Sequence, residues 1–285
     1  MVTKAIAKAD SGRADHLLRQ VAPELPRALM KQLFQQGRIR ANGRRVQASS
    51  MLSGPVTFEW DLPKPSAGTP NEHIRVLEEA PDWFAVSKPS GVHSVRLTGR
   101  GGPSLEDWLA IHEPSQERLA EHGLVNRLDL ETSGIVLVGR TEKIQQMLRD
   151  RLSGAEKTYW AGVIGNPPDE GIVDFELRAS SRNAPTVSKF GRRAQRTGIT
   201  RFHTTSRKDG FALLEVKLVG PGARHQIRAH LSGEGLPVAG DRLYGGDRLG
   251  APDRLALHAW KVKLDGSQEI TDPVPPELLD WWESL

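Results

Sequence analysis

Residues 126–140, "NRLDLETSGIVLVGR", carry the clearest structural pattern near the middle of this chain. Arg127 stands two positions before a carboxylate, Asp129, and a polar turn of Thr, Ser and Gly follows at residues 132–134. The apolar run at residues 135–138 then predicts a buried strand. Polar residues in such turns usually satisfy nearby backbone groups. What needs explanation is why an arginine and an aspartate stand with them at the mouth of a buried strand.

Strand patterns alternate irregularly with helix patterns on both sides of this stretch. Apolar runs bounded by turn residues predict strands at residues 74–79, 83–87, 135–140, 157–165 and 211–220. Helical spacing predicts helices at residues 104–112, 141–154 and 224–235, with Ser104 and Thr141 as N-caps of the first two. In the last strand, apolar residues at 212, 214, 216 and 218 alternate with polar neighbours. This order predicts an α+β fold around a mixed, mostly antiparallel sheet.

Two further polar clusters lie next to predicted strands. The first is "PGARHQIRAHL", residues 221–231, and contains Arg224, His225, Gln226 and Arg228. It could be a basic helix start on the surface, although cations are not the charge that a helix N-terminus favours. The second cluster, at residues 157–159, ends in Tyr159 and could be strand surface with a core aromatic.

The N-terminal part of the chain is basic. Residues 1–60 hold ten Lys or Arg and four Asp or Glu, a net charge of +6, which leaves −2 for the rest of a chain whose total is +4. Such a charge distribution indicates a polyanionic partner, because Lys and Arg contacts to phosphates drive nucleic-acid affinity. A merely solvated basic face is the alternative.

The pattern inside this basic part predicts two short helices, at residues 13–21 and 23–37, followed by a strand–turn–strand at "RIRANGRRV" with the turn at Asn42 and Gly43. Three prolines and no apolar periodicity mark residues 61–73 as a linker. We therefore expect domains at residues 1–60 and 74–285. The residues expected to face RNA phosphates in the first domain are Arg27, Lys31, Arg38, Arg40, Arg44 and Arg45.

Several classes of protein lack support in the sequence. No apolar run approaches the roughly 18–20 residues of a membrane span, and the N-terminus has no secretory apolar core. There is no cysteine, the nine histidines are scattered, and neither a phosphate-binding loop nor a GxSxG elbow occurs. We expect a cytoplasmic monomer that uses neither a metal nor a cofactor.

Taken together, these stretches resemble the RluA-type pseudouridine synthases. The hallmark loop HRLDxxTSG is matched by "NRLDLETSG", and further matches follow in the family's order, over about residues 72–280: "VLEEAPDWFAVSKPSGV", "KTYWAGVIG", "GARHQIRAHL", "GLPVAGDRLYGG" and "RLALHAWKVKL". Residues 12–60 resemble the S-four RNA-binding module, which commonly precedes this catalytic domain. The resemblance implies an enzyme that isomerises uridines in ribosomal or transfer RNA to pseudouridine without a cofactor.

The resemblance also implies roles for single residues. Asp129 matches the essential carboxylate, Tyr159 the active-site tyrosine, Arg228 the basic partner of the aspartate, and Arg127 the arginine thought to push the target base out of its stack. Two positions depart from the family pattern: Asn126 replaces the leading His of the loop, and "PGARHQIR" replaces "TGRTHQIR", which brings Arg224 next to His225. Together with Arg127, Asn126, Arg224, His225 and Gln226 are expected to contact RNA.

The expected chemistry needs only these residue types. The bond from the sugar to the uracil nitrogen breaks, and the ring turns and rejoins through its carbon 5. The uridine must leave its stack first, at a cost of roughly a few kcal/mol. Two alternatives remain from the sequence: a non-catalytic RNA-binding or ribosome-assembly protein on the same scaffold, and a glycosidase-like hydrolase with Glu131 as a second carboxylate.

Overall fold

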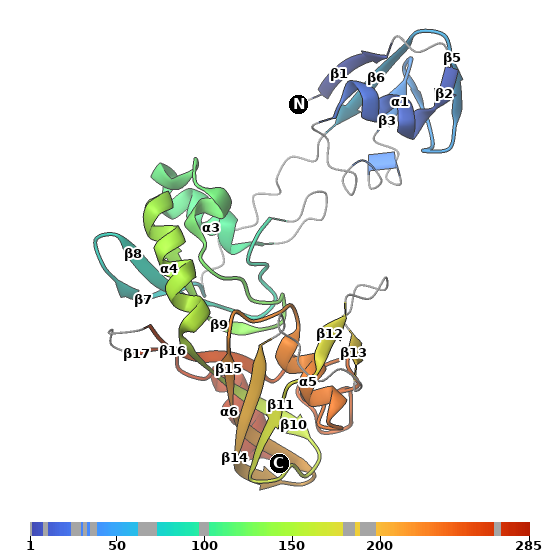
Figure 1. Cartoon of the computed structure of the whole chain (residues 1–285). Coiled ribbons are helices and arrows are strands. Elements are labelled where there is room, and N and C mark those ends of the chain that lie inside the picture. Colours follow the sequence, from blue (N-terminus) through green and yellow to red (C-terminus); the bar gives the residue numbers. More distant parts are fainter. Residues whose placement is uncertain are drawn as a thin grey trace. The chain divides into compact units, whose positions relative to one another are not determined.

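The computed structural model describes residues 2–7, 11–23, 30, 33–34, 39–61, 73–96, 103–178, 186–188, 198–264 and 269–285. The chain divides into two compact units, Met1–Thr69 with Arg96–Pro103, and Pro70–Val95 with Ser104–Leu285 (Figure 1). We call them the N-terminal unit and the larger unit. Among the described residues, no helix is both long and apolar enough to cross a membrane.

The N-terminal unit is built on an antiparallel sheet with the strand order β1-β6-β3-β4. These strands are β1 (Val2–Ala7), β6 (Val56–Asp61), β3 (Ile39–Ala41) and β4 (Arg44–Arg45). A second pair joins β2 (Ser11–Arg13) to β5 (Met51–Ser53), and α1 (Ala14–Val21) follows β2 directly. Leu17 and Leu18 of α1 pack with Phe58 and Trp60 of β6 in one core. The helix expected at residues 13–21 is present as α1.

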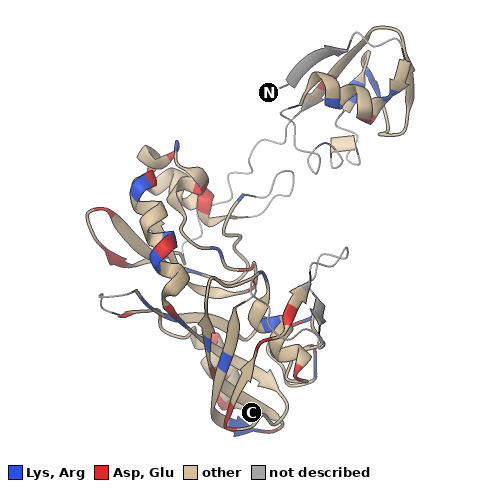
Figure 2. Ribbon diagram, in the orientation of Figure 1, with Lys and Arg blue, Asp and Glu red and all other residues tan. Residues whose placement is uncertain are grey.

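A tight turn joins β3 to β4, as the Asn-Gly pair predicts. Asn42 and Gly43 have φ angles of 50° and 78°, the left-handed values that a type I′ hairpin requires. The Asn42 side chain also accepts a hydrogen bond from Thr57 N at 2.8 Å, which ties the turn to β6. Arg40, Arg44 and Arg45 are exposed on this hairpin, and the basic residues of the described part are blue in Figure 2.

The larger unit contains a nine-stranded sheet with the order β11-β14-β15-β10-β16-β9-β8-β7, and β17 pairs with β16. The strands are β7 (Arg75–Glu79), β8 (Trp83–Lys88), β9 (Ser133–Gly139), β10 (Glu156–Ile164), β11 (Glu170–Val173), β14 (Ile199–Lys208), β15 (Phe211–Val219), β16 (Leu257–Lys263) and β17 (Glu269–Thr271). All neighbours are antiparallel except β9 and β16, which run parallel. The sheet is thus mixed and mostly antiparallel, and the α+β expectation is confirmed.

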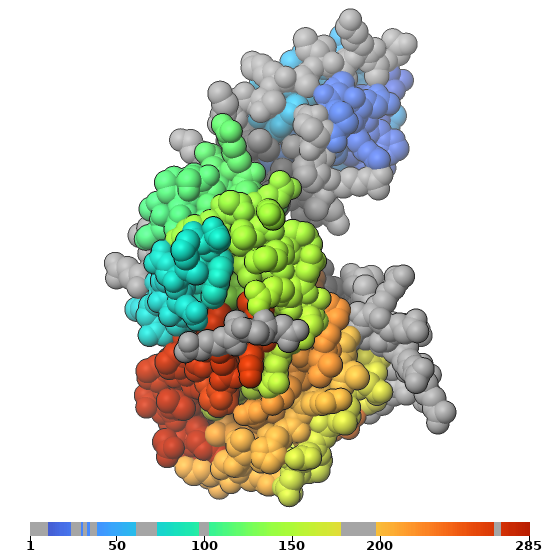
Figure 3. Space-filling view, turned by 60° about the vertical axis from the view of Figure 1, so that its left-hand side comes forward, coloured from blue at the N-terminus to red at the C-terminus, as the bar shows by residue number. Residues whose placement is uncertain are grey.

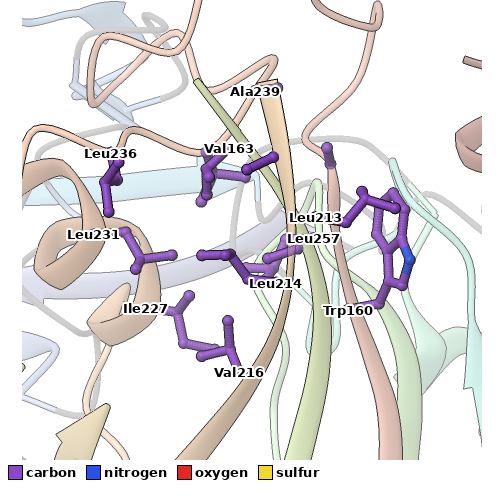
Figure 4. Close-up of a cluster of buried hydrophobic side chains, with 14 of the residues drawn as sticks. Trp160, Val163, Leu213, Leu214, Val216, Ile227, Leu231, Leu236, Ala239 and Leu257 are labelled. Carbon is purple, nitrogen blue, oxygen red and sulfur yellow. The ribbon is translucent and has the colours of Figure 1, made fainter. Parts of the chain in front are cut away.

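Helices cover both faces of the sheet around β10 and β15. Ile227 and Leu231 of α5 (Gln226–Gly233) pack with Leu214 and Val216 of β15 in one cluster (Figure 4). On the other face, a Cβ added to Gly162 would lie 2.6 Å from the Trp281 ring of α6 (Pro276–Ser284). Leu213 pairs with Gly162 and is buried on this second face. The alternation expected for β15 is therefore incomplete.

The other half of the sheet is covered by α3 (Leu105–His112) and α4 (Glu142–Gly154). Both begin as the sequence predicts: Asp107 N donates to Ser104 Oγ at 3.0 Å, and Ile144 N donates to Thr141 Oγ1 at 3.2 Å. In the space-filling view, the cyan β7–β8 segment borders the light green part of the chain that contains α4 (Figure 3). A short 3₁₀ turn at Pro114–Gln116 leads toward the loop before β9, followed by the segment Ala120–Gly123, in which Glu121 and His122 have left-handed backbone angles.

The parallel contact between β9 and β16 depends on Gly134. Its φ is +123°, and a Cβ there would lie 2.3 Å from Ala259 O and 2.5 Å from Ala259 N. Only glycine lets the backbones of the two strands come this close. The glycine of the Thr-Ser-Gly turn therefore fixes where β9 starts against β16, and so where the preceding loop with Asp129 lies.

Some elements were not expected from the sequence. These are β1, β2, β5, β6, β11, β14, β16 and β17, together with α6 and the hairpin of β12 (Glu176–Arg178) and β13 (Thr186–Ser188). Most of the helix expected at residues 23–37, and the linker expected at residues 61–73 apart from Asp61 and His73, lie outside the described residues. Asp61 belongs to β6, so the expected linker begins one residue inside a strand.

Candidate active site

The loop before β9, residues 128–131, is held by the segment that follows β8. The Ser94 hydroxyl accepts from Leu128 N at 2.9 Å and lies 2.8 Å from Leu128 O, while the Ser90 hydroxyl donates to Glu131 O at 2.8 Å. Gly91 N donates to Leu130 O at 2.9 Å. Backbone groups on both sides of Asp129 are therefore fixed, and the position of its carboxylate is set by this segment.

Lys88, at the end of β8, lies fully buried beneath the same loop. Its Nζ donates to the carbonyls of Pro89, Val92 and Leu130 at 3.0, 2.7 and 3.3 Å. Burial and the Arg254 guanidinium lower the pKa of Lys88 to about 7, while the charge of Asp129 acts in the opposite direction. Three carbonyl acceptors match the three N–H groups of an ammonium, so the protonated form ties the loop most completely.

The Asp129 carboxylate, whose side chain is about one-quarter exposed, faces two groups of the α5 region. Arg228 Nη1 donates to Oδ2 at 3.2 Å, and His225 Nε2 lies 3.6 Å from Oδ1. Glu131 lies farther off, with its Oε2 4.0 Å from Arg228 Nη2. The sequence interpretation that paired Asp129 with Arg228 thus agrees with their geometry, across 99 residues of chain.

Arg228 is anchored by a second carboxylate, Asp241. Its Nε and Nη2 donate to the two oxygens of Asp241 at 2.6 and 2.8 Å, and the Asp241 side chain has no exposed surface. The charge of Asp241, with that of Asp129, raises the pKa of Arg228 although burial acts against it. The guanidinium therefore stays charged, and its remaining nitrogen faces Asp129.

Tyr244 lies on the other side of Arg228 and His225. The Arg228 guanidinium carbon lies 5.3 Å from the centre of the Tyr244 ring, a cation–π distance. The Tyr244 hydroxyl lies 3.2 Å from His225 Nδ1. Burial raises the pKa of Tyr244 to about 12, so the phenol is neutral near pH 7.

Tyr159, on β10, faces the same side of the sheet as α5. It pairs with Val216, which belongs to the cluster around Ile227. Burial, with a smaller contribution from the Asp129 charge, raises the pKa of Tyr159 well above its usual range. Tyr159 is thus a neutral phenol, and it lies close enough to Asp129 for that charge to affect its pKa. Its neighbour Lys157 is buried and donates to Gly220 O at 2.5 Å.

Two of the residues expected to contact RNA lie before the loop and differ in exposure. Arg127 is exposed and forms an ion pair with Glu121. Asn126 is engaged with β9, because its Nδ2 donates to Ile135 O at 3.2 Å and its Oδ1 accepts from Leu137 N at 2.9 Å. The departure from the family's histidine therefore places an amide that fastens the loop to the strand.

The other residues expected to contact RNA also differ in whether they are exposed or buried. Arg224 is exposed at the start of α5. Gln226 is buried, its Oε1 accepts from Ala223 N at 2.9 Å, and its Nε2 donates to Thr200 at 3.3 Å, so we expect it to shape the turn before α5. In the N-terminal unit Arg40, Arg44 and Arg45 are exposed, while Arg27, Lys31 and Arg38 lie outside the described residues.

A buried polar network fastens the start of β9 to β16. Arg254 Nη2 donates to Ser133 Oγ at 2.7 Å, and Ser133 Oγ lies 2.9 Å from His258 Nδ1. Arg254 also pairs with Glu277 of α6 at 2.7 Å. Burial lowers the pKa of His258, which favours a neutral imidazole. The serine of the Thr-Ser-Gly turn is therefore held by the side chains of both Arg254 and His258.

The sequence interpretation assigned no role to Lys88, Asp241, Tyr244 or Arg254. Lys88 and Asp241 are charged residues among apolar neighbours, in "FAVSKPSG" and "PVAGDRLYGG", and a charge in such surroundings is a signal of a buried ion. Leu130, which joins Lys88 to the Asp129 loop, lies 42 residues from it, and Arg228 lies 13 residues from Asp241, so these pairings were not visible in the sequence.

The arrangement can position an anionic oxygen beside a fixed cation and a neutral phenol, next to exposed basic side chains. Among the described residues, no group of three or more His, Asp or Glu side chains could hold a metal ion. The site suits acid–base or nucleophilic chemistry by one carboxylate on a substrate that carries phosphates.

Comparisons with known proteins agree on one family. A sequence model of the family described as RNA pseudouridylate synthase matches residues 82–233. An uncharacterized RNA pseudouridine synthase of Chloroflexus aurantiacus is 31% identical over 93% of this chain and 87% of its own length. A protein of Xylella fastidiosa named ribosomal large subunit pseudouridine synthase D is 30% identical over 82% of this chain and 71% of its own length. In fold, the solved structure of human RNA pseudouridylate synthase domain containing 4 is similar, with a TM-score of 0.55 at 22% identity over 73% of this chain and 91% of that chain.

Proposed function

This chain belongs to the RNA pseudouridylate synthase family and is a pseudouridine synthase, and we propose that it isomerises uridines of ribosomal RNA with Asp129 as the catalytic carboxylate. Ribosomal RNA is favoured over transfer RNA because several relatives, such as those of Xylella fastidiosa and Yersinia pestis, are named ribosomal large subunit pseudouridine synthase D. The reaction takes place in the cytoplasm, on a monomeric enzyme.

The observation that carries the role of Asp129 is its contact with Arg228, 3.2 Å from Nη1 to Oδ2. Arg228 is itself held by the buried carboxylate of Asp241 and cannot easily turn away. A carboxylate with a fixed cation at one oxygen is oriented before substrate arrives, which is the condition for efficient attack or proton removal. Its partial exposure leaves room for a uridine to reach it.

Tyr159 and Arg127 would act on the target uridine itself. The partly buried, neutral phenol of Tyr159 offers a flat face and a hydroxyl to a uracil ring that has left its stack. Arg127 is exposed and pairs with the side chain of Glu121, so it can exchange that carboxylate for the RNA. Stacking of this kind is worth about 1–3 kcal/mol per base and offsets the cost of flipping.

The experiment that tests this function incubates purified protein with ribosomal RNA transcribed in vitro and maps pseudouridine by chemical labelling, with transfer RNA as a parallel substrate. Isomerisation leaves the mass of the RNA unchanged, a hydrolase would release uracil, and a binding protein would do neither. Modification of transfer RNA alone would refute the proposed substrate, and uracil release would refute the proposed reaction.

A further inference from the structure

The two groups that face Asp129, Arg228 and His225, are both held by one turn, residues 241–244. We propose that this turn is the positioning element of the site: Asp241 fixes the Arg228 guanidinium, and the Tyr244 hydroxyl fixes the His225 tautomer so that Nε2–H points at Asp129. Arg228 then orients one oxygen of Asp129 through a hydrogen bond, and His225 Nε2 lies 3.6 Å from the other oxygen, where its proton can stabilise the negative charge. The inference rests on the proposed role of Asp129.

Asp241 has the complete set of partners expected of a fixed anchor. Its carboxylate accepts from Arg228 Nε and Nη2 at 2.6 and 2.8 Å, and its Oδ1 also accepts from the backbone N–H groups of Leu243 and Tyr244 at 3.0 and 3.1 Å. A bidentate pair of this kind fixes the plane of the guanidinium. With no exposed surface on Asp241, water does not compete for these bonds.

The partners of His225 favour a proton on Nε2, because the Tyr244 hydroxyl can donate to Nδ1 while the Asp129 carboxylate beside Nε2 can only accept. Burial lowers the pKa of His225, with the charges of Asp129, Arg228, Arg224 and Asp241 also acting on it, so the ring is neutral near pH 7. The neutral Tyr244 hydroxyl, 3.2 Å from Nδ1, can donate to it. Nδ1 then accepts, and the single ring proton belongs to Nε2, which lies 3.6 Å from Asp129 Oδ1.

The backbone of His225 gives an independent sign that its position is held. His225 has a φ of 56°, in the left-handed region, at the residue before α5. A side chain in this region persists where its surroundings hold it. Tyr244 is fixed in turn, since Ser232 Oγ of α5 donates to Tyr244 O at 2.9 Å. The turn and α5 therefore brace each other around the two groups that contact Asp129.

Tyr244→Phe tests the inference, because it keeps the ring beside Arg228 and removes only the hydroxyl. We expect kcat to fall about fivefold to tenfold, the factor that corresponds to one neutral hydrogen bond, with KM for RNA within about twofold. The tautomer of His225 is read directly from the nitrogen shifts of ¹⁵N-histidine-labelled protein. It should be Nε2–H in the parent chain and a mixture of tautomers in the variant.

The matched control is Thr204→Val. It removes one buried hydroxyl, which donates to Pro168 O at 2.6 Å, from a residue outside the Asp129 cluster. Its kcat and the His225 spectrum should match the parent chain. Asp241→Asn gives a second measurement: it keeps the size of the side chain but weakens the hold on Arg228, so kcat should fall about a hundredfold in protein that retains its circular dichroism spectrum.

A parental kcat together with a parental His225 spectrum in Tyr244→Phe would overturn the inference, whether or not Asp241→Asn folds. The result is separable from the proposed function. If Asp129→Asn is inactive while Tyr244→Phe behaves as the parent, only the positioning role is wrong. If Asp129→Asn turns over, the role of Asp129 is wrong, although the nitrogen shifts still report whether Tyr244 sets the tautomer.

Discussion

At the scale of single residues, the site depends on a carboxylate and on the buried charges arranged beneath and beside it. Asp129 is partly exposed, Arg228 and Asp241 form a buried pair beside it, and the fully buried Lys88 donates to its loop. We expect Asp129, the Arg228–Asp241 pair and Lys88 to have separate functions. Substitutions in these three places should therefore have three different effects on activity and stability.

Asp129→Asn keeps the size and polarity of the side chain and removes its charge. We expect pseudouridine formation to fall by at least about 10³-fold, the scale on which enzymes lose activity without the group that performs the chemistry. RNA affinity should stay within about twofold, because an anion does not hold a polyanion. The measurement is turnover and RNA binding by the purified variant. Asp209→Asn, the same change on the exposed turn between β14 and β15, is the control and should turn over normally.

Arg228→Met should abolish most turnover and also destabilise the protein. It leaves Asp241 buried without its cation, a loss of about 3–5 kcal/mol in the free energy of unfolding. Combining it with Asp241→Asn removes both charges, so we expect stability to recover and turnover to remain low. Arg228→Lys should retain part of the activity, because an ammonium lacks the planar fork that bridges Asp241 and Asp129. Recovery of turnover in the double variant would show that Arg228 serves stability alone.

The lowered pKa of Lys88 predicts how the free energy of unfolding depends on pH. Its pKa is about 7 in the folded chain and near 10.5 in the unfolded chain, so between these values the unfolded chain binds a proton that the folded chain lacks. This group therefore makes the free energy of unfolding rise with pH across that window, and it contributes no slope below pH 7. Urea unfolding at pH 7 and pH 9 should show a rise about 1–2 kcal/mol smaller in Lys88→Met than in the parent chain. Lys143→Met, at an exposed position of α4, is the control.

At the scale of elements, the parallel junction of β9 and β16 places the Asp129 loop. Antiparallel neighbours surround this junction, and it is short: Ser133 pairs with His258 and Gly134 with Ala259. Gly134 permits the close approach, and the network of Ser133, Arg254 and His258 fastens it. A change at this point should affect stability and activity together, since the Asp129 loop ends where β9 starts.

Gly134→Ala should destabilise the larger unit by about 2–5 kcal/mol, because the strain of a left-handed φ adds to a clash with the backbone of Ala259. Gly235→Ala is the matched control: its φ is +78° and nothing lies within 4 Å of the added Cβ, so it should cost only about 1–2 kcal/mol. Thermal and urea unfolding measure the difference. Equal losses in the two variants would mean that the close approach of β9 and β16 does not depend on glycine.

At the scale of the whole molecule, charge is divided unevenly along the chain. Residues 1–60 carry +6, and the remaining residues carry −2. The exposed arginines of the β3–β4 hairpin belong to the described part of this basic surface, as do Arg13 and Arg19. We expect the N-terminal unit to add RNA affinity through phosphate contacts, while the chemistry belongs to the larger unit.

Replacing Arg40, Arg44 and Arg45 together by Gln should weaken RNA binding and flatten its dependence on salt. Each lost phosphate contact lowers the slope of log affinity against log salt concentration by about 0.7–0.9, so three contacts would lower it by about 2–3. Turnover at saturating RNA should be unchanged. The matching triple change to Lys keeps the charges and should keep the slope. A parental slope in the Gln variant would mean that the hairpin does not touch the RNA.

The local features of this protein could be predicted from its sequence. Apolar runs located β8, β9, β10 and β15, side-chain caps marked the starts of α3 and α4, and Asn42-Gly43 marked the hairpin. These features depend on residues within a few positions of one another, so a single stretch of chain contains their cause. The pairing of Asp129 with Arg228 came from the family resemblance, since no periodicity links residues 99 positions apart.

Contacts between residues that are distant in sequence became visible only in the folded chain. The parallel contact of β9 with β16, the burial of Lys88 under the loop, and the turn that holds Arg228 and His225 each join segments that are distant in sequence. Strands such as β1, β2 and β17 were not predicted from the sequence, because they are short or weakly apolar. They are stabilised by the strands that pair with them. Pairing and burial are properties of neighbours in space, and a sequence lists only neighbours along the chain.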